Sequence, residues 1–496
     1  MKHKIKIVIL MATLIFTFLI VSSVMAETIQ WNDNSAKTSE STEWANWKTR
    51  WKTVKNDYEQ ICLTPGKTEA QLNFAWYSKK DNQAKVRIST SKDMKNPISY
   101  KGKSSKYKKL MGTTYYTNKT TANKLKNNTV YYYQYYKDGA WSKSYQYVTR
   151  DPESFSLLYV GDPQIGASVG QIIIDTDIIL TGAAAARNDA YSWNTTLKSA
   201  LKRTPNLSFI ISAGDQINNV VSDGSAKNNL QQEMEYAGFL SPKIMKSVPI
   251  ATTIGNHDFQ TANYKKHFNN PNSFTEETSA VEAGNGYYYS YGKALFIVLD
   301  TNNYNCADHA ALLKQAVDAN PEAIWRIVTF HHDIYGSGSK HSDSQGMILR
   351  TQLTKLMDQY DIDVVLQGHD HTYSRSYQLK GDGRSHTFYD ASIDLTDSVV
   401  KKEFLKQNRC YTIVDKSSGT VTDPKGVLYM EANSSTGSKF YALASTKYDY
   451  IAAKSQTHRP TYSIIDITDA EFTINTYDVS SGNKIDESYT IRKSIK

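Results

Sequence analysis

The sequence predicts a small all-β sandwich followed by a larger α/β domain, and three observations support this. Between residues 59 and 150, short runs rich in aromatic and β-branched residues alternate with polar turns about every ten residues. After residue 150, apolar runs that suit buried strands alternate with helix-like segments. Five of these runs end in Asp, Asn or His. A chain of 496 residues with 40% hydrophobic and 22% charged residues suits two or three globular domains and excludes disorder throughout.

The first 26 residues have the form of a secretory signal. Lys2, Lys4 and Lys6 precede an apolar run over 7–21, and small residues end the segment at Ala26. We therefore expect cleavage before Glu27 and a protein that is secreted or held at the cell surface. An uncleaved N-terminal anchor stays open, because a run of about 15 to 18 apolar residues is marginal for crossing a bilayer. No later run of that length occurs, so no membrane span is expected after removal of the signal.

Charge and cysteine content exclude several classes of protein. The net charge of +9 falls to +6 without the three lysines of the signal. A charge this mild does not indicate a nucleic-acid partner, and it fits a small anionic substrate or simple solubility. Cys62, Cys306 and Cys410 lack the spacing of a thiolate metal site. We expect free thiols, with one disulfide at most.

Residues 27–58 are rich in Ser, Thr, Asn and Trp, which predicts an irregular N-terminal linker. Residues 59–150 follow as the sandwich, which resembles a fibronectin type III-like module. The spacing typical of a tyrosine corner is carried by Leu125, Thr129, Tyr131 and Tyr133. The tyrosines of 129–136 favour core and cross-strand packing. A carbohydrate-binding surface is the alternative.

Asp151-Pro152-Glu153 marks a domain junction, because a residue before proline is held extended. The strands expected after it cover 155–160, 207–213, 248–254, 326–330 and 362–367. Helix-like segments cover 229–246 and 347–360. Residues 171–186 favour a packing helix over an insertion that covers a site. Residues 461–477 suit a closing β-hairpin that serves the core.

The polar clusters at the strand ends are the chemically informative part of the chain. They are Gly161-Asp162, Gly214-Asp215, Gly255-Asn256-His257-Asp258, His331 and Gly368-His369-Asp370-His371. Because strand ends at one edge of such a sheet lie together, we expect these side chains to converge. Asp, Asn and His are ligands for Zn, Mn and Fe, and the preceding glycines let the backbone turn off each strand. His369 and His371 could contact two metals about 3.5–4 Å apart.

The ordered set of motifs, with Gly368-His-Asp-His-Thr-Tyr-Ser-Arg375 as its most specific member, resembles the calcineurin-like metallophosphoesterases. The purple acid phosphatase branch is the most similar, since it carries a sandwich before its catalytic domain. The resemblance extends from Glu59 to the C-terminus. It implies that residues 151–496 form a four-layer α/β/β/α sandwich with a dinuclear metal centre.

The resemblance also implies a role for each motif residue. Asp162 and His371 would hold the first metal, Asp215 would bridge, and the second metal would be held by Asn256, His331 and His369. The two ions would come from Fe, Zn or Mn. His257 would act as the general acid that protonates the leaving oxygen. His341 would contact the substrate, and Arg375 would orient the histidine loop.

Two positions depart from the family pattern. Asn218 stands where the purple branch has a tyrosine ligand, so the first metal need not be ferric iron. Gln164 stands where many members of the wider family have a histidine, and it would ligate weakly or hydrogen-bond to a metal-bound water. Both changes put a neutral amide in the place of a stronger ligand.

The resemblance implies a secreted phosphatase of the acid phosphatase type. It would hydrolyse small phosphate monoesters by attack of a metal-bridging hydroxide, with His257 as acid and no covalent enzyme intermediate. A phosphodiesterase or nucleotidase on the same site remains open. So does a catalytically weak surface-binding protein in which the sandwich does the work.

Overall fold

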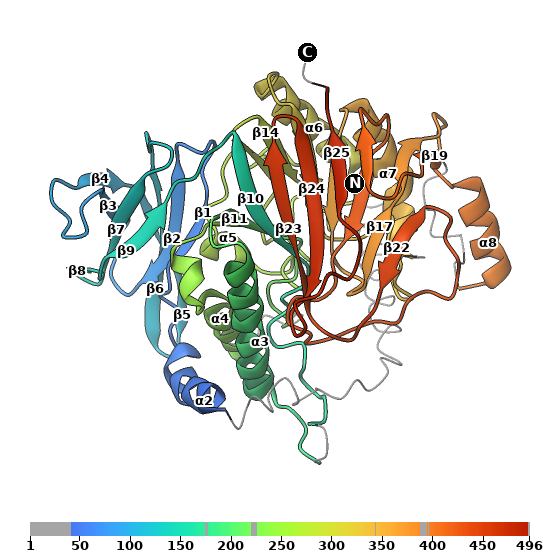
Figure 1. Cartoon of the computed structure of the whole chain (residues 1–496). Helices are drawn as coiled ribbons and strands as arrows, with labels where there is room; N and C mark the ends of the chain where they lie inside the picture. The colour runs from blue at the N-terminus through green and yellow to red at the C-terminus, as the bar shows by residue number, and fades with distance from the viewer. Residues whose placement is uncertain are drawn as a thin grey trace, which may run out of the picture.

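The computed structural model describes residues 41–173, 177–219, 226–342, 344–386, 394 and 396–494. The expected signal, residues 1–26, lies outside this part of the chain. Figure 1 shows the small β-sandwich at the left, beside a larger domain built around two central sheets. Within the described residues, no helix combines the length and the apolar character needed to cross a membrane.

The sandwich has two antiparallel sheets. One has the order β1-β2-β6-β5, formed by β1 (Cys62–Pro65), β2 (Leu72–Ser78), β6 (Thr113–Ala122) and β5 (Lys103–Leu110). The other has the order β4-β3-β7-β8, and β9 also pairs with β7. Its strands are β4 (Ile98–Lys101), β3 (Lys85–Ser89), β7 (Val130–Lys137), β8 (Ala140–Trp141) and β9 (Tyr145–Val148).

The tyrosines of β7 serve this sandwich as expected. Tyr131, Tyr133 and Tyr135 alternate inward and are buried in the core with Phe74 and Trp76. The Tyr131 hydroxyl accepts a hydrogen bond from the backbone N–H of Lys126 at 2.8 Å, which is the tyrosine corner. Core packing therefore accounts for the inward tyrosines of the run.

The first sheet of the larger domain is mixed and has the order β12-β11-β10-β23-β24-β25-β20. Its strands are β12 (Ile250–Thr252), β11 (Leu207–Ser212), β10 (Ser154–Val160), β23 (Thr461–Thr468), β24 (Glu471–Asp478), β25 (Tyr489–Arg492) and β20 (Thr420–Thr422). β10, β11 and β12 run parallel, while β23 and β24 form the expected hairpin.

The second sheet has the order β13-β14-β15-β16-β21-β17-β22. Its strands are β13 (Tyr287–Tyr291), β14 (Ala294–Val298), β15 (Trp325–Thr329), β16 (Val364–Gln367), β21 (Leu428–Glu431), β17 (Tyr373–Ser376) and β22 (Ile451–Ser455). β14, β15, β16 and β21 are parallel. A separate two-stranded ribbon joins β18 (Gln378–Gly381) and β19 (Tyr411–Asp415).

The two sheets pack face to face, and helices cover their outer faces. Phe155 and Phe209 of the first sheet meet Phe296 and Val364 of the second in one core. α3 (Gly182–Arg203), α4 (Ala226–Leu240) and the 3-10 helix η2 (Lys243–Lys246) cover the first sheet, and α6 (Cys306–Ala319) and α7 (Gln345–Gln359) cover the second. The short helices are α5 (Asn263–His267) and α8 (Ser398–Gln407). The predicted four-layer α/β/β/α architecture is confirmed (Figure 1).

The structure corrects part of the irregular linker predicted for residues 27–58, of which residues 27–40 lie outside the described chain. α2 (Thr42–Val54) is a regular helix, capped by Ser41, whose hydroxyl accepts from the N–H of Trp44. Trp44, Trp47 and Trp51 lie three and four residues apart, so they share one face. That face is buried in the core beside α3 and α4. The polar composition of the segment concealed this periodicity.

The helix favoured for residues 171–186 begins later than expected and continues to Arg203. α3 begins only at Gly182, and Ile172 pairs with Ile179 as an isolated β-bridge ahead of it. Residues 174–176 lie outside the described chain. The three cysteines are free, as expected.

Candidate metal centre

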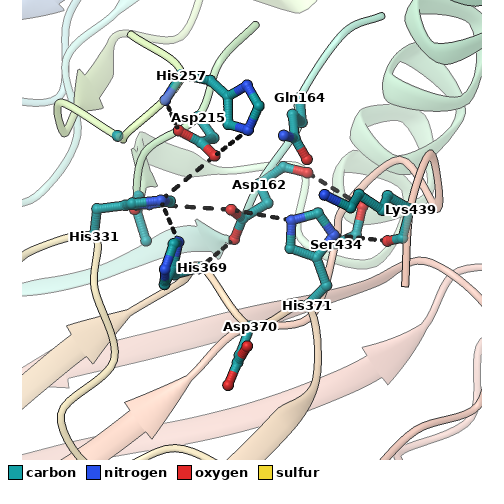
Figure 2. A network of polar contacts seen from close by, with 12 residues as sticks. Asp162, Gln164, Asp215, His257, His331, His369, Asp370, His371, Ser434 and Lys439 are labelled. Atoms are coloured by element: carbon teal, nitrogen blue, oxygen red, sulfur yellow. Dashed lines mark hydrogen bonds and ion pairs between the residues drawn. The ribbon is translucent and has the colours of Figure 1, made fainter. Parts of the chain in front are cut away.

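The structure brings the six predicted metal ligands together at the carboxyl ends of β10, β11, β12, β15 and β16. They are Asp162, Asp215, Asn256, His331, His369 and His371. Figure 2 shows Asp162 at the centre of this group, with the histidines around it and His257 on the far side of Asp215. The two carboxylates and the three histidines are buried, with at most 5% of any of them exposed.

Asp162 and His371 form one half of the centre. Oδ1 of Asp162 lies 3.4 Å from Nε2 of His371. Nδ1 of His371 lies 2.7 Å from the carbonyl of Lys439 and must donate to it, so Nε2 turns a lone pair toward Asp162. Among the described residues, Asp162 Oδ1 has no hydrogen-bond partner although it is fully buried. A buried carboxylate oxygen facing an imidazole lone pair fits a cation.

His331 forms the other half. Its Nδ1 donates to the carbonyl of Ala213 at 2.9 Å, which leaves Nε2 facing the centre. Nε2 lies 2.9 Å from Oδ1 of Asn256, 3.1 Å from Nδ1 of His369 and 3.4 Å from Oδ2 of Asp215. Burial lowers the pKa of His331, but the carboxylates of Asp215 and Asp162 outweigh it and raise that pKa to about 9. The surroundings thus favour a positive charge where a metal would bind.

The backbone at the site is strained. Asp162, Asp215, His369 and His371 all have φ between 39° and 80°, a region that non-glycine residues rarely adopt. Gly214 has a φ of 109°, and a Cβ there would lie 2.4 Å from Nδ1 of His331. At this position the predicted role of glycine in the turn is correct, and close packing adds to it.

His257 lies beside the ligands. Its backbone N–H donates to Oδ1 of Asp215 at 2.8 Å, and its Nδ1 lies 2.5 Å from the carbonyl of Asn218. Nδ1 must therefore carry a proton, while Nε2 lies 4.0 Å from Oδ2 of Asp215. Burial lowers the pKa of His257, although Asp215 opposes the shift. One fifth of the side chain is exposed, so the ring is accessible from the solvent.

The two departures from the family pattern lie next to one another. Nε2 of Gln164 is 3.4 Å from Oδ1 of Asn218, and Oε1 of Gln164 is buried without a hydrogen-bond partner in the described chain. That oxygen is available to a cation. Asn218 acts through its carbonyl, which holds the ring of His257.

Arg375 is directed toward the C-terminal part of the first sheet. Its Nε donates to Oδ2 of Asp486 at 2.7 Å, and its guanidinium lies 4.7 Å from the ring centroid of Tyr489. This anchors β17, the strand that follows the histidine loop. That Arg375 orients the histidine loop stays a prediction.

Sequence reasoning missed Lys439 and Tyr441, which lie in the loop after β21. The ring of Tyr441 lies 5.2 Å from that of His371 and 5.3 Å from that of His341, between ring centroids. Nζ of Lys439 lies 4.7 Å from the centroid of the Tyr441 ring. Burial lowers the pKa of Lys439, while Asp215, Asp162 and Asp370 raise it. No motif marked this loop, because only the fold brings it to the site.

A second buried acidic group, Asp333, Asp370 and Glu431, lies behind His341. Oγ of Ser342 is 2.5 Å from Oδ2 of Asp333 and 2.8 Å from Oδ2 of Asp370. A hydroxyl has one proton, so one of these two carboxyl groups must be protonated. Burial, Asp370 and Glu431 raise the pKa of Asp333 well above its usual range. Neutral Asp333 therefore donates to Ser342, which donates to Asp370.

The layered fold and the cluster of Asp, Asn and His side chains together define a metallophosphoesterase. Two family models agree: the calcineurin-like phosphoesterase model matches residues 155–373, and the purple acid phosphatase N-terminal domain model matches residues 58–149. Residues 155–373 thus carry a calcineurin-like phosphoesterase domain, and residues 58–149 carry a purple acid phosphatase N-terminal domain.

Individual relatives are distant. Purple acid phosphatase 23 of Arabidopsis thaliana is 26% identical over 172 residues, which cover 32% of this chain and 36% of that protein. The alignment thus spans about a third of that relative. The structure of purple acid phosphatase PPD1 from yellow lupin seeds matches with a TM-score of 0.59 at 15% identity, covering 88% of this chain and 74% of that one. A structure of PhoD matches with a TM-score of 0.53 at 11% identity, covering 89% of this chain and 95% of that one. Both likenesses concern the fold.

Proposed function

We propose that this protein is a metal-dependent phosphatase that hydrolyses small phosphate monoesters. The observation that carries the proposal is the convergence of six buried or half-buried ligand residues beside a histidine that can deliver a proton. The donor set, with an unpartnered carboxylate oxygen and imidazole lone pairs, suits Fe, Zn or Mn.

In this proposal two ions share the ligands. Asp162 and His371 would hold one ion, with weak help from Gln164, and Asp215 would serve both ions. Asn256, His331 and His369 would hold the second ion. When bound, the metals lower the pKa of coordinated water and neutralise phosphate oxygens.

His257 supplies the proton that the leaving oxygen needs. Its Nδ1 proton is committed to the carbonyl of Asn218, so Nε2 is the atom that gains and releases the catalytic proton. The backbone bond from His257 to Asp215 fixes the ring relative to the metal ligands.

Lys439 and His341 favour a monoester over a diester. A phosphate monoester carries two negative charges near neutral pH, whereas a diester carries one, so a nearby ammonium group stabilises the monoester more. Lys439 is half-buried and interacts with the carboxylates of the centre. His341 is held by Asp370, with its ring against that of His369.

We further propose that the protein is exported. The support is the basic and apolar segment 1–26. N-terminal sequencing of the protein from the culture medium would test this, since cleavage before Glu27 is the expected result. Full-length protein in the membrane fraction would favour the uncleaved anchor.

The central experiment compares hydrolysis of an aryl phosphate monoester and an aryl diester with added Mn, Fe, Zn or Ni. We expect faster turnover of the monoester and two metals per chain. Asp215→Asn should lose metal and activity by about 10- to 100-fold or more, and His257→Ala should lose activity while retaining metal. Faster diester turnover would favour a phosphodiesterase. Failure to bind metal or turn over either ester would favour a surface-binding protein.

A further inference from the structure

A basic groove lies between the sandwich and the α/β domain. Its volume is about 800 Å³, and it is lined by residues of β5 and β6 on the sandwich side and by α5 and the following segment 268–285 on the other. The lining includes none of the metal-centre residues described above. The two walls are joined directly: the Thr117 hydroxyl donates to the carbonyl of Lys266, and Asn269 Nδ2 donates to the carbonyl of Thr120.

The charge of the groove is one-sided. Five lysines line it, and the lining contains no Asp or Glu: Lys101, Lys103, Lys119, Lys265 and Lys266. None of the ion pairs found in the described residues involves any of these five. By contrast, Lys108 on the same strand β5 pairs with Glu233 at 2.8 Å. The fold thus gathers positive charge in the groove without neutralising it.

Polar atoms in the lining also lack partners. Oγ of Ser104, Oγ1 of Thr120 and Oδ1 of Asn270 are buried without hydrogen-bond partners in the described chain. Thr120 is only 2% exposed. Burial lowers the pKa of Lys119 to about 8, with Lys266 and Lys265 adding to the shift. Uncompensated charge and unpaired buried groups both cost stability. The lysines and the buried side-chain oxygens of the groove thus lack favourable partners within the protein.

We propose that this groove is a second, non-catalytic binding site for a polyol that carries two or more phosphate groups. Lysine ammonium groups and hydroxyls donate to phosphate oxygens, and five lysines can neutralise more than one phosphate. The side-chain oxygen Oδ1 of Asn270 is an acceptor, and phosphate oxygens are acceptors too, so its partner on the ligand would be a hydroxyl. The volume falls within the range of about 300–1,000 Å³ typical of small-ligand sites.

The test uses fructose 1,6-bisphosphate as the probe, measured by titration calorimetry on the full-length protein. An Asp215→Asn background limits hydrolysis and leaves the metal centre the same in every variant compared. Lys119→Gln with Lys266→Gln should weaken binding about tenfold or more. The control pair Lys92→Gln with Lys95→Gln removes the same charge from exposed sandwich positions outside the groove and should leave binding within about twofold. Orthophosphate should bind the groove about tenfold more weakly than the bisphosphate, because it meets fewer lysines.

A second readout separates a ligand site from a structural one. Without ligand, the groove pair should melt at the same temperature as the background protein or higher, because lysine repulsion is relieved. Bisphosphate should raise the melting temperature of the background protein more than that of the groove pair. Equal binding by the groove pair and the background protein would overturn the proposal. Equal weakening by the control pair would overturn it as well, since net charge alone would then explain the effect.

Discussion

Nδ1 of His341 lies 2.7 Å from Oδ1 of Asp370. The same carboxylate also accepts from the backbone N–H groups of His341 and Ser342. Asp370 is fully buried, while about a fifth of the His341 side chain is exposed. The carboxylate thus keeps a proton on Nδ1 and leaves Nε2 available on the site side. We infer that Asp370, set between the two predicted metal ligands His369 and His371, is a positioning residue that acts through His341.

Asp370→Asn should lower kcat for an aryl monoester about 10- to 100-fold, the usual range for partners that orient a functional group. An amide can present its NH₂ to His341 and reverse the tautomer of the ring. Steady-state kinetics and metal content give the readout. If the variant loses metal in proportion to activity, Asp370 acts on the metal ligands rather than on His341.

A double-mutant cycle sharpens this test. If Asp370 acts through His341, then His341→Asn combined with Asp370→Asn should be no slower than His341→Asn alone. Multiplication of the two single effects would show that the residues act independently.

The position of His257 predicts an alkaline limb in the pH profile of activity. A general acid works in its protonated form, and burial holds the pKa of His257 below its ordinary value of 6.5. Turnover of esters with poor leaving groups should therefore fall as the pH rises through that lowered pKa. A pH profile of kcat for an alkyl phosphate would show this limb, and His257→Asn should remove it. Aryl esters, whose leaving groups need less protonation, should lose less activity in the variant.

Glu233 ties the two domains together and should make the protein sensitive to acid. It lies between Lys108 of β5 at 2.8 Å and His267 of α5 at 2.9 Å. Burial raises the pKa of Glu233, but His267 and Lys108 outweigh it and lower that pKa to about 2. A lowered carboxyl pKa stabilises the fold above pH 4.5, and this contribution is lost as the pH falls toward 2.

Glu233→Gln should cost about 3–5 kcal/mol at pH 7, because it leaves Lys108 without its charged partner. The melting temperature of the variant should also change less than that of wild type between pH 4.5 and 2. Parallel pH profiles for the two proteins would show that Glu233 does not carry this linkage.

Helix α2 should contribute directly to the stability of the α/β domain. Trp47 is 6% exposed, and its indole N–H donates to the carbonyl of Arg187 on α3 at 2.8 Å. Trp47→Ala should cost about 3–5 kcal/mol through lost packing and the lost hydrogen bond. Lys48→Ala on the exposed side is the matched control and should cost less than about 0.5 kcal/mol. Thermal denaturation of both variants checks the difference, and equal losses would contradict the packing role of α2.

Several features of the site could be predicted because they are local in the chain. The motifs Gly214-Asp215 and Gly255-Asn256 each follow a predicted strand, so they indicate where the polar side chain leaves the sheet. Their glycines indicate that the backbone there is closely packed. A Cβ at residue 255 would lie 2.0 Å from Oδ1 of Asp215, so that glycine is required for close approach. The sequence did not predict helix α2, because only three tryptophans among polar residues mark its helical periodicity.

The sequence by itself determined the two-part architecture, the order of the motifs and the kind of atoms that converge, because periodicity and residue chemistry are properties of short segments. Only the tertiary structure decided which partners hold those atoms. The carbonyls of Ala213, Asn218 and Lys439 set the tautomers of three histidines. The tertiary structure alone also brought the lysines of β5 and β6 against those of α5. The three histidine contacts join residues 118, 39 and 68 positions apart, and they arise when the layers pack.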